Sequence, residues 1–304
     1  MTANTTTAGP QTDHPVLGIA LRILSGALFA IMAIFIKALS GNVPVGQIVF
    51  FRSAFALIPL VIFLWLRSEF PAGLATKRPF GHLLRSGFGA AAMFASFASI
   101  ARLPLAEATL LGYLSPVFTA VAGVAILSEK ATVWRIGGVL LGVAGVLALV
   151  WPELGYGSGN ASRLVGYGLG LIMGLLTAFA LIMVRTLNRT ESPGAIAFYF
   201  VVASMIGGIA TIPLGWVWAD AHTLILLVLA GIFGGLAHIA MTLAFRNAEA
   251  SLLAPFEYLA VLWPVLADLL IFKAPISSAF LVALPLVLAG AGLAAMEGRR
   301  RTAR

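Results

Sequence analysis

The chain has 304 residues, of which 61% are hydrophobic and 10% are charged. A soluble domain carries roughly a quarter charged residues, so this composition excludes a water-soluble globule. The formal net charge of +8 would suggest nucleic acid as a partner of a soluble protein, whereas in a membrane protein it reports topology. The absence of cysteine excludes disulfides, thiol nucleophiles and Cys-ligated metal centres.

Apolar runs, broken at charges and at Pro, Gly and Asn clusters, define ten predicted helices of about 20 residues, the length that crosses a hydrocarbon core. In chain order they cover residues 16–39, 44–66, 80–102, 105–127, 132–151, 165–187, 193–218, 222–246, 250–272 and 276–296. The remainder comprises a disordered cytoplasmic tail at 1–15, a linker at 152–164 and a basic cytoplasmic tail at 297–304. The sequence therefore predicts an all-α integral membrane protein.

The distribution of Lys and Arg predicts the orientation, because these residues favour cytoplasmic loops. With the N-terminus inside, thirteen fall on the inner side: Arg67, Lys77, Arg78, Arg85, Lys130, Arg135, Arg185, Arg189, Arg246, Arg299, Arg300, Arg301 and Arg304. Only four fall on the outer side: Lys37, Arg102, Arg163 and Lys273. Both termini are predicted to lie in the cytoplasm, in agreement with an even number of spans.

The two halves of the chain resemble each other. At an offset of 148 residues, matches include Gly18 with Gly166, Gly26 with Gly174 and Lys37 with Arg185. Two further segments recur at other offsets: 58–60 as 212–214, both Ile-Pro-Leu, and 106–111 as 248–253. Residues 16–151 and 165–296 are therefore predicted to be two five-helix repeats, and because five is odd, the second is inverted. Inverted repeats are typical of alternating-access transporters that bind substrate near the midplane.

These features resemble the drug/metabolite transporter superfamily, in its ten-helix branch of two EamA-type repeats. The resemblance covers about residues 16–296 and is carried by Arg52, the segment from Ala106 through Pro116 to Glu129, Gly138, Gly142, Gly145, and 255–258 with Trp263. It implies that helices 1, 3, 4, 6, 8 and 9 surround a central cavity and that helices 5 and 10 brace the outside. The sequence departs from the family pattern at one position. The Glu that often ends the fourth helix of each repeat is present in the first repeat as Glu129 but is replaced in the second by Lys273.

Charged residues at bilayer depth cost at least about 2.5 kcal/mol to insert, which makes them functional candidates. Glu257 lies close to Pro255, which removes a backbone donor. We expect Glu257 to bind substrate or to carry a proton for coupling, and the alternative is a static ion pair with an arginine. Asp268, near the outer end of the same helix, is expected to be an interfacial cap or a partner of Lys273.

His238 lies inside the eighth predicted helix and is expected to line the substrate site, the alternative being a structural histidine. Arg52 could meet a substrate carboxylate, but a helix tie or a side chain that reaches the interface is favoured. The candidates for coupling or gating are Glu257, Arg52, Pro116 and Pro255.

Aromatic and small polar residues near the predicted midplane complete the candidate substrate site: Tyr113, Ser115, Tyr258, Trp263, Met93, Ser96 and Phe97. Aromatic faces with few polar groups suit a small amphipathic ligand, and ordinary helix packing is the alternative for each residue. Trp263 is the strongest candidate, because the other tryptophans fall near predicted helix ends, where indoles favour the membrane interface.

The predicted function is a secondary transporter of small metabolites. From the resemblance, we expect an amino-acid exporter of the bacterial cytoplasmic (inner) membrane, and the aromatic lining favours large neutral or aromatic amino acids. No cofactor, catalytic residue, metal site, nucleic acid or obligatory protein partner is expected. The protein is expected to be a monomer whose partners are a small-molecule substrate and the lipid bilayer.

Two alternatives belong to other classes of protein. An intramembrane enzyme acting on a lipid or lipid-linked substrate could use His238 and Glu257 as an acid/base pair, but this function does not explain the repeat. A passive channel would require more polar residues along one pore than the sequence offers.

Overall fold

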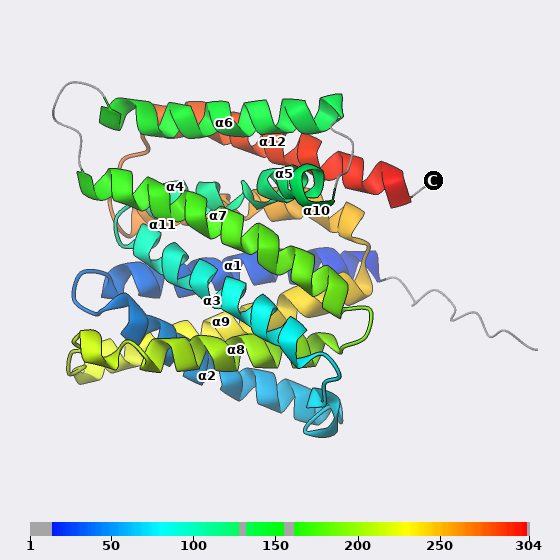
Figure 1. The fold of residues 1–304 in the computed structure, drawn as a ribbon. Coiled ribbons are helices and arrows are strands. Elements are labelled where there is room, and N and C mark those ends of the chain that lie inside the picture. The colour runs from blue at the N-terminus through cyan, green and yellow to red at the C-terminus, as the bar shows by residue number, and fades with distance from the viewer. Residues whose placement is uncertain (1–13, 128–131, 155–160, 303–304) are drawn as a thin grey trace, which may run out of the picture.

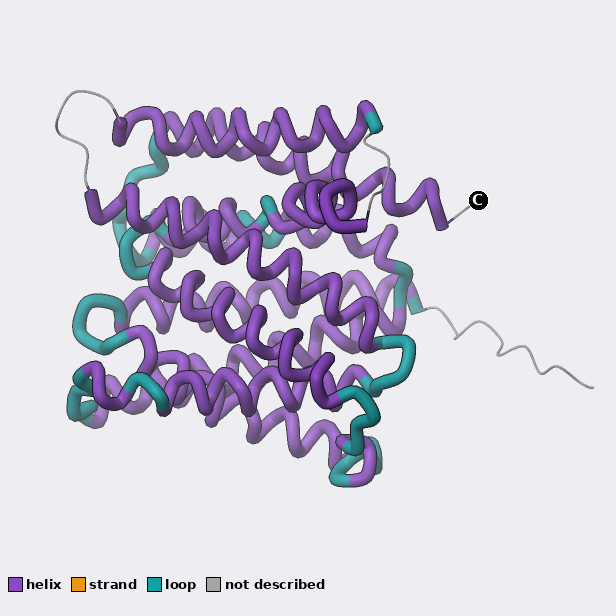
Figure 2. The backbone as a smooth tube through the Cα atoms, viewed as in Figure 1, coloured by secondary structure: helices purple, strands orange, loops and turns teal. Residues whose placement is uncertain are grey.

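A computed structural model describes residues 14–127, 132–154 and 161–302 of the chain. Within these ranges the chain is all-helical, as predicted, and its helices are joined by short loops (Figures 1 and 2). The α-helices are α1 (Pro15–Leu39), α2 (Val45–Leu66), α3 (Pro79–Ile100), α4 (Leu105–Gly112), α5 (Ser115–Leu127), α6 (Val133–Leu154), α7 (Ala161–Leu187), α8 (Pro193–Ile209), α9 (Ala221–Asn247), α10 (Ala250–Leu259), α11 (Leu262–Leu270) and α12 (Ser278–Thr302). Two 3-10 turns are η1 (Ala72–Leu74) and η2 (Ile212–Leu214).

Local sequence explains where several helices begin. Pro15, Pro79 and Pro193 lie in the first turns of α1, α3 and α8, where the missing N–H has no intrahelical partner to lose. Asp220 caps α9 by accepting a hydrogen bond from the Thr223 amide at 2.9 Å. These starts fall within about four residues of the predicted ones, the accuracy that sequence patterns allow.

The predicted fourth and ninth helices are each broken in two. Pro116 breaks the fourth, since its ring would clash with the carbonyl of the residue four positions earlier, and α4 ends at that residue, Gly112. Pro264 acts in the same way in the ninth, where α10 is capped at Ala260. Pro255, a predicted gating residue, lies inside α10, and the helix continues past it.

The predicted seventh helix, 193–218, is too long. α8 ends at Ile209, and Pro213 lies in the 3-10 turn η2, which closes at Gly215 in the left-handed conformation (φ +93°). Pro59, by contrast, lies inside α2. The two Ile-Pro-Leu segments are therefore not structurally equivalent, and that match between the halves is wrong.

The chain is a multi-pass membrane protein. Seven helical segments are long and apolar enough to span a bilayer, and two more, Pro193–Ile209 and Ser278–Ala294, are apolar but shorter. Joined end to end, α10 and α11 complete a tenth crossing (Figure 1). The start of α1 and the end of α12 lie at the same end of the bundle (Figure 1). Large apolar side chains, among them Leu140, Trp151 and Leu281, are exposed, as expected on a surface that faces lipid.

Contacts between the helices relate the two halves. α1 packs against α9 and α3 against α7, while α2 packs against α8 and α6 against α12. The broken helix α4–α5 lies against α7, and α10–α11 lies against α1. When each helix is exchanged for its counterpart five crossings later, this set of contacts maps onto itself. The two prolines that cause the breaks, Pro116 and Pro264, also share the offset of 148 residues.

Glycines bring α6 and α12 into close contact along the edge of the bundle (Figure 1). A Cβ added at Gly290 of α12 would lie 2.8 Å from the carbonyl oxygen of Gly138 and 2.8 Å from the amide nitrogen of Gly142 on α6. Backbone atoms cannot swing aside as a flexible side chain can. Small residues at these positions therefore permit this approach, as in other membrane helix pairs.

We expect Gly290→Ala to destabilise the protein by about 1–3 kcal/mol, because the new methyl group forces α6 and α12 apart. Thermal unfolding of the purified protein in detergent measures the effect. Gly292→Ala, two residues away in the same helix, is the control, since a Cβ there has nothing within 4 Å. Equal melting temperatures for the two variants would contradict the role given to Gly290.

Candidate functional site

The two helix breaks are joined by a hydrogen bond across the centre of the protein. Tyr113, the C-cap of α4, donates its hydroxyl to the backbone oxygen of Glu257 in α10 at 2.9 Å. The rings of Tyr113 and Tyr258 lie 5.9 Å apart. In transporters, interrupted helices of this kind supply backbone polar groups to the substrate site, so these breaks mark the candidate site.

Glu257 is paired with an arginine. Nη2 of Arg22 in α1 lies 3.4 Å from Oε1 of Glu257, and the side chain of Arg22 is buried while 49% of the Glu257 side chain is exposed. The predicted static pair therefore exists, but it leaves much of the carboxylate accessible. The sequence analysis did not assign Arg22 a role, although a basic residue within a predicted span was a signal for one.

His238 lies in α9 between two aromatic rings. Its imidazole meets Phe29 edge-on at 4.9 Å and lies 6.3 Å from the ring of Phe200 in α8. Among the described residues, no hydrogen bond or ion pair links His238 to Glu257, which binds Arg22 instead. The acid/base pair required by the enzyme alternative is therefore not assembled.

Two further arginines lie near His238. Arg52 of α2 is 2% exposed, and a Cβ on Gly234, one turn before His238, would lie 3.0 Å from its Nε. The guanidinium carbon of Arg85 lies 4.3 Å from the centroid of the Phe200 ring. Arg85 was predicted to lie on the cytoplasmic side within the helix 80–102; it lies in the first turns of α3, and its Nε and Nη1 are buried.

The other predicted site residues divide into two groups. Trp263 and Tyr258 keep accessible surface, and the Trp263 indole faces Gly26 of α1, where a Cβ would lie 3.6 Å from Cδ1. Ser96 is half-buried, and Ser115 is buried at the first residue of α5. Met93 and Phe97 belong to the hydrophobic core, so ordinary packing accounts for both. Glu129, named in the family resemblance, lies outside the described residues.

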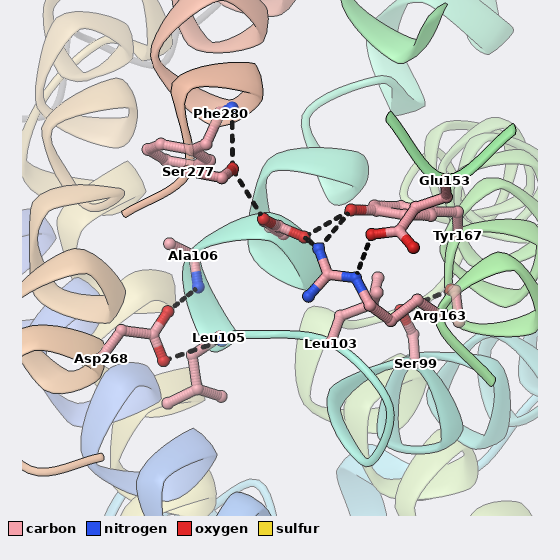
Figure 3. Close-up of polar contacts among 12 residues, drawn as sticks. Ser99, Leu103, Leu105, Ala106, Glu153, Arg163, Tyr167, Asp268, Ser277 and Phe280 are labelled. Atoms are coloured by element: carbon pink, nitrogen blue, oxygen red, sulfur yellow. Dashed lines mark hydrogen bonds and ion pairs between the residues drawn. The ribbon is translucent and has the colours of Figure 1, made fainter. Parts of the chain in front are cut away.

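A buried polar network ties helices together at the end of the bundle that the predicted orientation makes extracellular (Figure 3). Glu107 of α4 accepts hydrogen bonds from the Tyr167 hydroxyl at 2.6 Å and from Nη2 of Arg163 at 3.0 Å, both in α7. Arg163 also pairs with Glu153 of α6, and Ser277, just before α12, donates to Glu107 at 3.0 Å. The network therefore joins both halves of the chain.

Two more charged residues cap helix ends nearby. Asp268 of α11 accepts hydrogen bonds from the backbone amides of Leu105 at 3.0 Å and Ala106 at 2.8 Å (Figure 3). Two roles were predicted for Asp268, an interfacial cap or a partner of Lys273. These hydrogen bonds make it a cap, at the start of α4. Lys37 of α1 donates to backbone oxygens at the end of α3, at 2.7 and 2.8 Å. The outer ends of both halves are thus joined by buried charges.

A smaller polar cluster lies at the opposite, predicted cytoplasmic end. Nε2 of His82 lies 3.2 Å from Oε2 of Glu191, and both side chains are buried. Burial tends to raise the pKa of Glu191, but hydrogen bonds from the Thr76 and His82 side chains and from the Lys77 amide lower it below its usual value. The sequence analysis missed this pair because its members are 109 residues apart.

A pocket of about 380 Å³ also opens at this end, between the start of α3 and the end of α7. Its lining includes Lys77, Arg78, Phe80 and Leu187, and none of the predicted site residues. The pocket is therefore separate from the site at the helix breaks.

Known proteins similar to this chain are membrane transporters. The EamA-like transporter family model matches residues 16–151. The pseudopaline exporter CntI of Pseudomonas aeruginosa is 30% identical over 81% of this chain and 84% of its own. The riboflavin transporter of Rhizobium johnstonii is 26% identical over 88% and 87%, and solute carrier family 35 member G1 of Mus musculus is 25% identical over 87% and 74%.

A solved crystal structure has the same fold. It aligns with a TM-score of 0.65 at 19% identity and covers 94% of this chain and 99% of that one. The relatives and the family model define the chain as a membrane transporter rather than an enzyme. The chain belongs to the EamA-like transporter family of the drug/metabolite transporter superfamily, which confirms the resemblance seen in the sequence.

We expect Glu107→Gln to destabilise the protein by roughly 2 kcal/mol, because it removes one of the two carboxylates that face the partly buried Arg163, while Glu153 remains. Thermal unfolding in detergent measures the change. Glu69→Gln breaks the more exposed pair with Arg67 and should cost about 1 kcal/mol or less. A similar loss of stability in both variants would argue against a special role for the outer network.

Proposed function

We propose that this protein is a secondary transporter that exports amino acids, with large neutral or aromatic ones as preferred substrates. The main observation in support is the contact between the two broken helices, where an accessible carboxylate lies close to aromatic rings. Glu257 offers a negative charge to a substrate ammonium group, and Tyr113, Tyr258 and Trp263 offer aromatic faces to its side chain.

Helix α1 supports this proposal because one of its faces lies along Glu257, Trp263 and His238. Arg22 binds Glu257, Gly26 faces Trp263, and Phe29 meets His238. Residues four and three positions apart lie on one side of a helix. At 1.5 Å per residue, the stretch from Arg22 to Phe29 is about 10 Å long, which is enough for a large amino acid.

We also propose alternating access between two repeats, 16–151 and 165–296. The buried network of Glu107, Tyr167 and Arg163 would keep the outer end closed, and its release would open the site outward. In this proposal the protein acts as a monomer in a bacterial inner membrane with both termini in the cytoplasm. The relatives include both an exporter and an uptake transporter, so the direction of transport needs its own measurement.

Counterflow in proteoliposomes tests the function. Vesicles that contain the purified protein are loaded with one unlabelled amino acid, and the entry of a panel of labelled ones is followed. We expect faster entry of phenylalanine, tryptophan or leucine than into protein-free vesicles. Uptake at the protein-free rate for all amino acids would contradict amino-acid transport, and uptake that does not depend on internal substrate would favour a passive channel.

Trp263→Ala is expected to raise the KM for counterflow about tenfold or more, because it removes an aromatic surface from the proposed site. Trp151→Ala is the matched control, since Trp151 is 74% exposed at the outer end of α6. Initial rates over a range of substrate concentrations separate KM from the maximal rate. Equal changes in both variants would count against a substrate contact at Trp263.

Glu257→Gln is expected to flatten the pH dependence of transport, if protons drive it through this carboxylate. The groups that face Glu257 are Arg22 and, through the backbone, Tyr113, and both remain in the variant. Initial rates between pH 5 and pH 8 test this expectation. An unchanged pH profile in a correctly folded variant would leave Glu257 with only a binding or structural role.

A further inference from the structure

Arg52 is buried and Arg85 is half-buried, and no carboxylate among the described residues pairs with either of them. Nε and Nη1 of each guanidinium group are buried and make no hydrogen bond. By contrast, Arg22 and Arg163 each form an ion pair with a carboxylate. A buried charge that lacks a partner is unfavourable, so such residues are rare within membrane spans and mark functional sites.

The described carboxylates with identified partners are committed elsewhere in the fold. Glu107 and Glu153 bind Arg163, while Glu257 binds Arg22. The rest bind at helix ends or in loops: Glu69 with Arg67, Glu191 with His82, Asp220 with the Thr223 amide, and Asp268 with the start of α4. None of these contacts reaches Arg52 or Arg85, so a static tie to one of these acids does not explain the two arginines.

Both side chains point toward the middle of the membrane. α2 and α9 both begin at the outer end, and the backbone oxygen of Arg52 faces Gly231, whereas its guanidinium faces Gly234, further along α9. α3 begins at the inner end, and Nη1 of Arg85 lies against Gly89, one turn further along that helix. Each arginine thus extends away from its nearer interface, the reverse of the snorkelling that was the favoured alternative for Arg52.

The two guanidinium groups lie beside α8 and α9, on either side of the contact between Phe200 and His238. Arg85 lies over the ring of Phe200, and that ring lies 6.3 Å from His238. Arg52 reaches Gly234, four residues before His238 in α9. His238 is half-buried, so part of its surface is accessible. Arg52, Arg85 and His238 therefore form one cluster, which we call the arginine cluster, built from α2, α3 and α9.

Glycines make room for both arginines. A Cβ at Gly234 would lie 3.0 Å from Nε and 3.1 Å from Nη2 of Arg52. A Cβ at Gly89 would lie 2.5 Å from Nη1 of Arg85 and 2.9 Å from the Phe200 ring. The absence of a Cβ at these two positions therefore leaves the space that each guanidinium group occupies. Such preorganised donors suit an anion that is absent from the resting protein.

We propose that the arginine cluster binds the carboxylate of a small organic substrate. A planar guanidinium group can donate two parallel hydrogen bonds to a carboxylate. The bound anion would supply the negative charge that no described carboxylate places beside the two arginines. This inference rests on the proposed transport function and deepens it. The substrate carboxylate would lie near Phe200 and His238, and the exposed part of Glu257, which is paired with Arg22, would remain accessible to an ammonium group.

Binding of a matched pair of probes tests the proposal. 3-Phenylpropanoate carries a carboxylate, and 3-phenylpropanamide has nearly the same shape without the charge. Isothermal titration of the full-length protein in detergent gives the dissociation constant of each probe. We expect the wild-type protein to prefer the acid about tenfold or more, and Arg52→Gln and Arg85→Gln each to reduce this preference about tenfold. Arg85→Lys should retain part of it.

Two controls distinguish binding from a structural role. Arg102, in the turn after α3, is exposed and donates to the Ala98 oxygen of that helix, so Arg102→Gln should keep the full preference. Melting temperatures without probe should be unchanged or higher in Arg52→Gln and Arg85→Gln, because each variant removes an unpaired buried charge. A marked fall in melting temperature would instead reveal a structural tie and overturn the proposal.

Other results would also overturn the carboxylate assignment. These are equal binding of the acid and the amide, no binding of either, an unchanged preference in both glutamine variants, or displacement of the acid by chloride as readily as by acetate. Counterflow separates this inference from the proposed function. Amino-acid exchange with unchanged KM in both variants would contradict only the cluster, whereas failed exchange with intact acid preference would contradict only amino-acid transport.

Discussion

The hydrocarbon core of a bilayer contains no water that could bind backbone polar groups or charges, so the protein itself must bind them. This constraint governs the whole structure. Helices satisfy it by bonding their own backbone, which is why the described residues fold into apolar helices joined by short loops. The breaks at Tyr113 and Ala260 interrupt that pattern. The two broken helices contact each other there, because the Tyr113 hydroxyl donates to the oxygen of Glu257, which also accepts from the Ala260 amide. The exceptions to the constraint therefore coincide with the candidate site.

Charged residues obey the same constraint in two ways. At the outer end, Glu107, Arg163 and Asp268 are buried with partners, so the helix ends there are tied to one another. In the interior, Arg52 and Arg85 are buried without them. Satisfied charges hold a conformation, whereas unsatisfied charges favour the binding of a ligand that can satisfy them. Alternating access needs both properties, a closed end and a site that is completed by substrate.

The sequence predicted the crossings well and the broken helices poorly. Apolar runs identify spans because hydrophobicity is a local property, and the predicted starts of the helices lie within a few residues of those observed. The breaks depend on how Pro116 and Pro264 are accommodated by neighbouring helices, and Pro255, which looks alike in sequence, stays within α10. Arg85 lies inside the predicted third helix as well as inside α3, but the burial of its Nε and Nη1 depends on neighbouring helices and was not predicted.

By itself the sequence determined that the chain is a helical membrane protein, and its resemblance to known transporters was correct at the level of the family. Composition, span length and charge distribution suffice for this, because each residue responds to the bilayer largely independently of its distant neighbours. Only the tertiary structure decided which polar residues are paired. Glu257 meets Arg22 across 235 positions, Asp268 caps a helix 163 residues away, and Arg52 and Arg85 are left without a carboxylate. Partnership depends on distances between helices, which sequence patterns do not encode locally.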